Sequence, residues 1–261
     1  MSKGMLIDIT ACTGCRACVN ACRTKNRLDA PPGARLSETD FTVLEHRDRL
    51  AVRRMCYHCN DPACASACPV AAMVRTPEGP VAYDEHRCMG CRYCMVACPH
   101  GVPAFEWHSR MPRVRKCAFC PDHVAEGRPP PCATACPTEA TLFGDRDALI
   151  KAATARIDAR PERYYPGIWG RDVAGGTSVM FLSPVPFDRL GLRTDLGPDP
   201  LGHATGRILA LVPGTAATVV TVLGGTYWLY RRRAAVAAEQ ALAAARDGAD
   251  AAAREGREGG R

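Results

Sequence analysis

The sequence lacks the motifs by which most enzymes bind or transform a substrate. It contains no phosphate-binding glycine loop, no fingerprint of an organic cofactor and no paired acid–base constellation. Its last 125 residues also lack cysteine, because all sixteen cysteines lie between Cys12 and Cys136. The missing motifs argue against an enzyme. The cysteine distribution confines any cysteine chemistry to the first half of the chain.

An apolar signal segment is also missing, because the run from Met1 to Ile9 leads directly into Cys12. The cysteines stand two or three residues apart in tight clumps, and most pairs at that spacing cannot form an unstrained disulfide. A secreted disulfide scaffold is therefore disfavoured. The cysteines are better interpreted as thiolate ligands for metal.

The sixteen cysteines form four groups of four, here called groups 1 to 4. A C-x2-C-x2-C loop wraps three corners of a [4Fe–4S] cube, and a fourth cysteine three residues later ligates the other cluster of a two-cluster ferredoxin. Sixteen cysteines at four per cube leave none over, so the sequence predicts four [4Fe–4S] clusters. The groups are Cys12-x2-Cys15-x2-Cys18-x3-Cys22, Cys56-x2-Cys59-x4-Cys64-x3-Cys68, Cys88-x2-Cys91-x2-Cys94-x3-Cys98 and Cys117-x2-Cys120-x11-Cys132-x3-Cys136.

Proline usually follows the fourth cysteine of such a group. It follows Cys68, Cys98 and Cys136, whereas Arg23 follows Cys22. Group 1 therefore departs from the pattern.

Zinc is the main alternative, because C-x2-C pairs also build zinc ribbons. Zinc sites usually take their ligands from two cysteine pairs separated by a longer loop. A zinc-based nucleic-acid binder would also be colourless, whereas an iron–sulfur protein is brown. A redox enzyme that catalyses at one cluster would need an iron without a cysteine, and every iron here has one available. The histidines near the groups are interpreted as structural residues or hydrogen-bond donors, namely His58, His86, His100, His108 and His123.

The formal charge of +7 counts every cysteine as neutral. Each cubane with its four thiolates carries roughly −2, so four of them bring the balance to roughly −1. The basic residues are therefore better interpreted as compensation for cluster charge than as a nucleic-acid footprint. Those beside the cysteine runs are Arg16, Arg23, Arg87, Arg92, Arg113, Arg115 and Lys116. For any single arginine, a solvated surface position is an equal alternative.

Groups 1 and 3 resemble each other beyond their cysteines, since Asp8 and Asp84 each stand four residues before the first cysteine. Groups 2 and 4 both end in Ala-Cys-Pro. The chain therefore reads as a duplicated two-motif unit. The fold class predicted is α+β, with duplicated bacterial-type ferredoxin domains, insertions and one C-terminal transmembrane helix.

The secondary structure expected is mostly short. Strands are predicted at Met5–Ile9 and Val81–Tyr83, one or two helical turns after the third cysteine of each group, and a helix near Arg146–Ala159. An alternating run from Phe41 to Val52 predicts a strand. The predicted domains are 1–145, a four-cluster ferredoxin-like domain with an insertion at 23–55; 146–207, a cysteine-free extension and linker; 208–230, a transmembrane helix; and 231–261, a polar tail that is a frayed helix or disordered.

Residues 208–230 contain no charged side chain, and 23 helical residues can cross a bilayer core of about 30 Å. Tyr227, Trp228 and Tyr230 form an aromatic belt before three arginines at 231–233. The alternative is a buried helix of a soluble domain. The positive-inside rule places the arginines in the cytoplasm, so we expect a single-pass protein of the bacterial inner membrane with its cluster domain on the periplasmic face. Because a signal peptide is not seen, export together with a partner that carries one is the hypothesis.

At these runs the chain resembles the four-cluster ferredoxin-type subunits of membrane-bound respiratory oxidoreductases, of the formate dehydrogenase and hydrogenase-2 types. The resemblance extends over nearly all of residues 5–230. The residues that carry it are Leu6-Ile7-Asp8-Ile9-Thr10 with group 1, Cys56-Tyr57-His58-Cys59-Asn60-Asp61-Pro62-Ala63-Cys64, Cys98-Pro99, Lys116-Cys117-Ala118-Phe119-Cys120, Gly175-Gly176-Thr177 and Pro186-Phe187-Asp188-Arg189-Leu190-Gly191.

The resemblance implies an electron-transfer subunit without catalytic residues of its own. It would relay electrons between a catalytic subunit, such as a hydrogenase or a molybdopterin enzyme like formate dehydrogenase, and a membrane cytochrome b or polytopic quinone-reactive subunit. The alternative is the four-cluster subunit of another respiratory reductase, of the dimethyl sulfoxide or polysulfide type. The substrate of the catalytic partner and the direction of electron flow stay open.

The resemblance also implies nested pairing of the groups, first with fourth and second with third. The residues alone leave adjacent pairing open. The implied ligand sets are Cys12, Cys15, Cys18 and Cys136; Cys22, Cys117, Cys120 and Cys132; Cys56, Cys59, Cys64 and Cys98; and Cys68, Cys88, Cys91 and Cys94.

Overall fold

The computed structural model describes residues 2–258, with side chains described except at 202–206, 247 and 249–258. It divides into two compact units, Met1–Gly206 and Arg207–Arg261. The first unit mixes short strands and helices and holds all sixteen cysteines. The described residues of the second, up to Glu258, are part of one long helix.

A three-stranded sheet organises the first unit. Its central strand β1 (Lys3–Asp8) pairs antiparallel with β8 (Thr141–Asp145) and parallel with β9 (Val179–Leu182). Met5 and Ile7 join the larger core on one face, while Leu6 packs on the other. Alternate side chains of a strand point to opposite faces, so an unbroken apolar run suits a strand covered on both sides.

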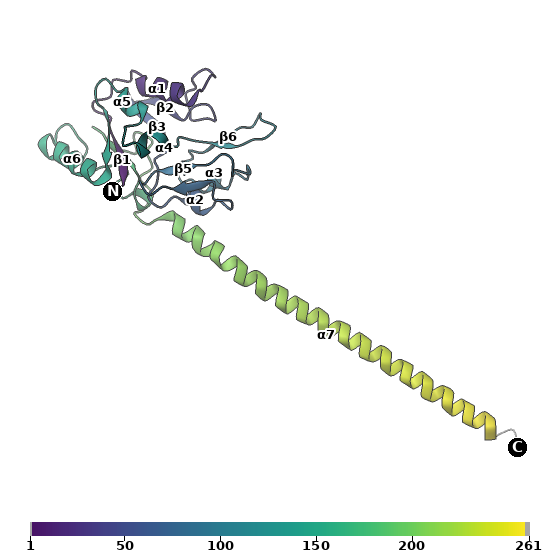
Figure 1. Cartoon of the computed structure of the whole chain (residues 1–261). Helices are drawn as coiled ribbons and strands as arrows, with labels where there is room; N and C mark the ends of the chain where they lie inside the picture. Colours follow the sequence, from purple (N-terminus) through teal and green to yellow (C-terminus); the bar gives the residue numbers. More distant parts are fainter. Residues whose placement is uncertain (1, 259–261) are drawn as a thin grey trace. The chain divides into compact units, whose positions relative to one another are not determined.

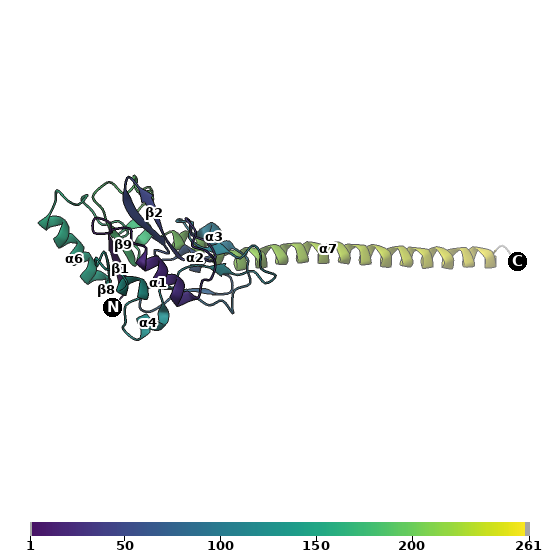
Figure 2. The same ribbon diagram turned by 90° about the horizontal axis from the view of Figure 1, so that it is seen from above.

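Helix α6 (Arg146–Ala159) covers one face of this sheet, and its bounds are those predicted from the sequence. Leu149 and Ala153, one helical turn apart, are buried against Leu6. Figure 2 shows α6 lying beside the labelled strands β1, β8 and β9. Helix α6 therefore covers this face of the sheet with apolar side chains, and none of the buried residues packed there is a cysteine.

The run from Phe41 to Val52 was expected as one strand, and that expectation is wrong. The structure has a hairpin of β2 (Thr42–Arg47) and β3 (Leu50–Met55). Its two-residue loop places Asp48 at φ 47° and Arg49 at φ 67°. Two successive residues in the left-handed region form the turn that matches strand twist. Asp48 is a usual first residue of such a turn, but Arg49 stands where glycine is usual.

The remaining elements are short and lie around the cysteine groups. Figure 1 shows α2, α3 and β5 gathered in one part of the first unit and α1, α5 and β2 in another. The strand predicted at Val81–Tyr83 is present. These elements are α1 (Ala17–Asn26), α2 (Ala63–Ser66), β4 (Met73–Arg75), β5 (Val81–Tyr83), α3 (Tyr93–Ala97), β6 (Ala104–Phe105), β7 (Val114–Arg115), α4 (Pro121–Ala125), α5 (Pro131–Thr134) and a 3-10 turn at Val173–Gly175.

Helix α7 (Leu201–Glu258) contains the uncharged run at 208–230 and continues through the polar tail. The tail is thus helical as far as Glu258, and the rest of it lies outside the described residues. Thr218 and Thr221 each donate a hydroxyl to the carbonyl four residues earlier, which satisfies polar groups inside the run. In the described part of the chain, the stretch Arg207–Arg246 is the one helix long and apolar enough to cross a membrane.

Candidate metal centres

The pairing of β1 with β8 brings the two ends of the cysteine region together. Their antiparallel ladder joins Ile7 to Thr141. Cys12 lies five residues after Ile7 and Cys136 five residues before Thr141, so both chains leave the ladder at the same end. A cavity there is lined by Cys12, Cys15, Cys18 and Cys136, here called set A.

A second ladder repeats this arrangement. Strands β4 and β5 pair Met73 with Tyr83. Cys68 lies five residues before Met73 and Cys88 five residues after Tyr83. The cavity at this end is lined by Cys68, Cys88, Cys91 and Cys94, here called set D.

Two further sets lie between long-range neighbours. A cavity lined by Cys22, Cys117, Cys120 and Cys132 defines set B. Set C consists of Cys56, Cys59, Cys64 and Cys98. Burial and then the nearby thiols of the other three members raise the pKa of Cys59, which places the four side chains close together. Each set corresponds to one of the ligand sets that the family resemblance implied.

Groups 1 and 3 begin with the same backbone path. Gly14 and Gly90 both have φ 72°, and Arg16 and Arg92 both have φ 64°. A left-handed conformation is easy for glycine and costly for a side-chain-bearing residue. The chain therefore accepts local strain at the two arginines in order to curl each loop around its cavity.

The three Cys-Pro segments form equivalent turns. The amide of Ala71 donates to the carbonyl of Cys68 at 3.3 Å, that of Gly101 to Cys98 at 3.2 Å and that of Glu139 to Cys136 at 3.2 Å. All three donors have positive φ, between 49° and 61°. The turn also directs the next amide to sulfur, since Ala72 N donates to Cys68 Sγ at 3.2 Å. Amide donors of this kind stabilise a thiolate.

Cys22 departs from this pattern because it lies inside helix α1, which continues to Asn26. Proline at position 23 would break that helix. Asn26, one turn later, donates its Nδ2 to the carbonyl of Cys22 at 2.8 Å and to its Sγ at 3.5 Å. A side-chain amide therefore supplies the donor that backbone amides supply elsewhere.

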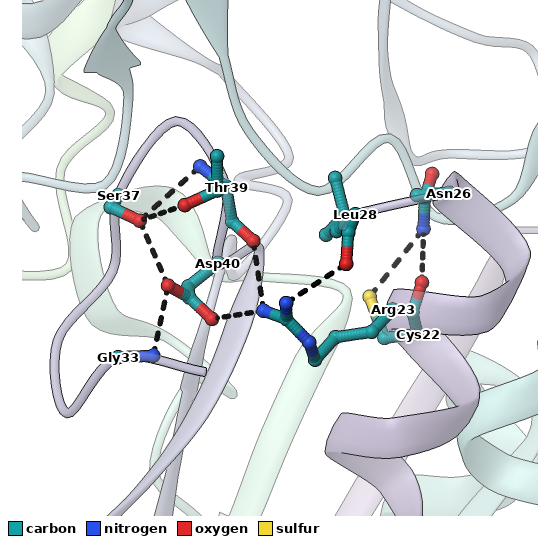
Figure 3. Close-up of polar contacts among 8 residues, drawn as sticks. All are labelled: Cys22, Arg23, Asn26, Leu28, Gly33, Ser37, Thr39 and Asp40. Atoms are coloured by element: carbon teal, nitrogen blue, oxygen red, sulfur yellow. Dashed lines mark hydrogen bonds and ion pairs between the residues drawn. The ribbon is translucent and has the colours of Figure 1, made fainter. Parts of the chain in front are cut away.

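Arg23 fastens the inserted segment to this helix (Figure 3). Its Nη1 donates to Asp40 Oδ1 at 2.7 Å, and its Nη2 to the carbonyl of Leu28 at 2.8 Å. The other oxygen of Asp40 accepts from Gly33 N at 3.1 Å and Ser37 Oγ at 3.0 Å. Asp40 is 3 % exposed, so this ion pair is largely withdrawn from solvent.

Most of the cysteine thiols are costly to ionise without a positive partner. Burial and then the Cys132 thiol raise the pKa of Cys22 to about 12, and burial and then Cys56 raise that of Cys64 to about 12. Cys136 is an exception: burial alone would raise its pKa, but amide and hydroxyl donors lower it overall. Thiolate ligands shared by iron remove this cost, so the donor sets fit iron–sulfur clusters.

Neighbouring sets lie close enough to interact. Arg53 lines both the cavity of set A and that of set B. The thiol of Cys56 helps to raise the pKa of Cys117, after burial and Cys22, which relates sets B and C. The thiol of Cys94 likewise helps to raise the pKa of Cys64, so sets C and D are neighbours. Set A is therefore a neighbour of set B, set B of set C, and set C of set D.

The basic residues singled out in the sequence occupy different environments. Arg16, Arg87 and Arg92 are exposed, while Lys116 is buried and donates to the carbonyls of Val81 at 2.7 Å and Cys117 at 3.0 Å. The sequence reasoning missed Arg53, which is 2 % exposed. One signal in the sequence could have identified Arg53 as buried. In a strand it lies on the same face as two apolar residues, Ala51 and Met55.

His58 is buried and His100 is half-buried, and neither is among the residues that line the cavities of sets A, B and D. His58 Nδ1 accepts from the amide of Val81 at 3.0 Å. Burial lowers the pKa of both imidazoles, to about 4 for His100. Among the residues that the structure describes, no three His, Cys, Asp or Glu side chains are close enough to hold a single metal ion.

Comparison with known proteins gives related sequences. A family model described as a 4Fe-4S dicluster domain matches residues 48–146, which include groups 2 to 4. A protein of Nitratidesulfovibrio vulgaris is 39% identical over 277 residues, covering 95% of this chain and 74% of the relative.

Two named relatives come from Escherichia coli. The hydrogenase-2 operon protein HybA of the O157:H7 strain is 32% identical over 238 residues, covering 73% of each chain. The iron-sulfur subunit of nitrate-inducible formate dehydrogenase of strain K12 is 33% identical over 197 residues, covering 68% of this chain and 66% of the relative.

Replacing Arg23 by alanine is expected to destabilise the first unit strongly, because it leaves Asp40 buried without its cation. Breaking a buried pair costs about 3–5 kcal/mol, which lowers the midpoint of thermal unfolding by roughly 6–20 °C. The matched control is Arg189→Ala, whose pair with Asp48 is more than half exposed on both sides. That change should cost no more than about 1 kcal/mol. Equal midpoints for the two variants at one scan rate would contradict the role given to Arg23.

Proposed function

Since the chain belongs to the ferredoxin-type iron–sulfur electron-transfer subunits of respiratory oxidoreductases, we propose that it carries electrons through four [4Fe–4S] clusters held by sets A to D. It is the electron-relay subunit of its complex and not the catalytic one. The single observation that carries the proposal is the gathering of all sixteen cysteines into four sets of four.

The ligand sets are supported by strand register and by cavity lining. Set A draws three cysteines from group 1 and its fourth from group 4, and set D draws three from group 3 and its fourth from group 2. The five-residue offset from the ladder is the same in both. Equal φ values at the paired loops, together with Asx turns in which Thr10 N donates to Asp8 at 3.0 Å and His86 N donates to Asp84 at 2.9 Å, support a duplicated ferredoxin unit.

The relay runs along the row A, B, C, D. When bound, each cluster would accept and release one electron. The protein's own part is to hold the sulfurs, to exclude water and to set local charge. Buried Cys117 and Cys132 in set B, and Cys56 in set C, belong to the main apolar core, so the middle of the row is the driest part.

The partners proposed are a catalytic subunit at one end of the row and a quinone-reactive membrane subunit at the other. The named relatives support a catalytic partner that is a hydrogenase or formate dehydrogenase. The exposed apolar helix at 208–230 supports attachment to the membrane.

Paired cysteine-to-alanine variants distinguish nested from adjacent pairing. If Cys12 and Cys136 bind the same cluster, changing both alters one cluster signal in electron paramagnetic resonance, whereas changing Cys12 and Cys68 alters two. Adjacent pairing predicts the reverse result. Wild-type protein prepared anaerobically should contain about sixteen iron atoms per chain. Iron near eight, or zinc in its place, would refute four cubanes.

Electron donors identify the catalytic partner. In native membranes, hydrogen or formate should reduce the clusters of this chain, and added quinone should reoxidise them. Cys91→Ala, which removes a ligand of set D at one end of the row, should lower donor-to-quinone activity to background while the catalytic subunit still reduces an artificial dye. Reduction by neither donor would favour a reductase of the dimethyl sulfoxide or polysulfide type.

We further propose that the first unit lies on the periplasmic side and that Arg231, Arg232 and Arg233 lie in the cytoplasm. These three arginines follow the uncharged run directly, as the positive-inside rule expects. Protease added to intact spheroplasts should remove an epitope fused to the N-terminus and spare one fused after Arg261 until lysis. Protection of the N-terminal epitope with loss of the C-terminal one would reverse the orientation.

A further inference from the structure

A buried cation lies between the first two cysteine sets. Arg53 projects from β3 into the core and is 2 % exposed. It is among the residues lining the cavity of set A and also among those lining the cavity of set B. Arginine stays charged in proteins, so a full positive charge is held between the two cavities.

The contacts that Arg53 makes are weak for a buried charge. Its Nε donates to Thr42 Oγ1 at 3.0 Å, and its Nη1 approaches Thr141 Oγ1 at 3.4 Å and Met5 Sδ at 3.8 Å. Its Nη2 has no nitrogen or oxygen partner among the described residues, and the Cys132 thiol lies within reach of the guanidinium. Hydroxyls and a thioether are neutral, so they do not balance the charge.

No carboxylate balances it either. None of the ion pairs formed by the described side chains includes Arg53. An unpaired buried charge is strongly destabilising, so its counter-charge comes from elsewhere. Eight thiols line the two cavities that Arg53 borders, and the one carboxylate in those linings, Asp122, pairs with Lys25.

Lys116 shows the contrast. This second buried cation donates to two backbone carbonyls, at 2.7 and 3.0 Å, and it lines none of the cavities of sets A, B and D. These contacts fix the backbone beside Cys117, and the charge of Lys116 acts on Cys64 of set C rather than on sets A and B. Arg53 instead directs an unpaired donor into the region between two sulfur sets.

We propose that Arg53 is the shared counter-ion of the clusters in sets A and B, and that its charge raises the reduction potentials of these two clusters relative to those in sets C and D. The inference rests on the proposed function. A fixed positive charge favours the more negative, reduced form of a nearby cluster, and it does so most strongly where water is excluded. One side chain thereby adjusts the reduction potentials of two of the four clusters.

The test is a redox titration of the purified full chain, followed by electron paramagnetic resonance, with signals of sets A and B assigned by their loss in Cys12→Ala and Cys117→Ala. In Arg53→Met the reduced-to-oxidised ratio of both clusters at a fixed ambient potential should fall at least tenfold, a shift of about 59 mV for one electron. Sets C and D should shift less than threefold. Arg53→Lys, which keeps the charge, should restore most of the ratio.

The matched control is Arg47→Met, which removes the same charge from the same hairpin but at a side chain that is 55 % exposed. It should leave all four clusters unchanged, because solvent screens that charge. No shift in Arg53→Met, an equal shift of all four clusters, or the same shift in Arg53→Lys would overturn the proposal.

Failure of the neutral variants to bind iron is also informative. Arg53→Gln, which keeps donors for Thr42 and Thr141, is therefore prepared in parallel. Loss of iron from Arg53→Met and Arg53→Gln with full loading of Arg53→Lys supports the counter-ion role. Loss from Arg53→Lys as well overturns it. Iron content and signal number in the wild type report on the proposed function separately, since they do not depend on Arg53.

Discussion

The structure depends on antiparallel strand pairing that closes two of the four cysteine sets, A and D, at their open side. A C-x2-C-x2-C loop can present three sulfurs by local curvature alone, but the fourth must come from far along the chain. The ladder of β1 with β8 brings Cys136 to the loop of group 1, and the ladder of β4 with β5 brings Cys68 to the loop of group 3. A one-residue slip in either register would turn the returning sulfur to the wrong face.

Electrostatics then decides which core side chains this scaffold can tolerate. Burial raises the pKa of most of the thiols, as at Cys22 and Cys64, so the folded chain opposes thiolates until iron shares their charge. Arg53 presents the opposite cost, a buried cation with no carboxylate. The negative charge of the thiolates and the positive charge of Arg53 balance each other only when the sulfurs are ionised as metal ligands. Cluster loading and the stability of the first unit are therefore linked.

Group 1 shows how an insertion alters a repeated motif without losing its chemistry. Helix α1 runs through Cys22, so the proline turn used at Cys68, Cys98 and Cys136 cannot form there. Asn26 replaces the lost amide donor, and Arg23 replaces the rigidity of proline by an ion pair to Asp40. The result keeps the sulfur oriented while tying the inserted hairpin to the cluster region.

The local features of this protein follow from its sequence, because they depend on neighbouring residues. Cysteine spacing predicted the loops, and apolar runs predicted the strand Val81–Tyr83, helix α6 and the uncharged part of α7. Only the tertiary structure decided that residues 179–182 pair with β1, that Phe41–Val52 contains a turn and that Arg53 is buried. The pairing of β9 with β1 depends on contacts between segments 174 residues apart, as between Met5 and Val179, whereas the turn depends on two left-handed residues that include no glycine. Residue spacing and secondary-structure propensity do not predict such contacts, because distant segments gain packing energy only after the chain has folded.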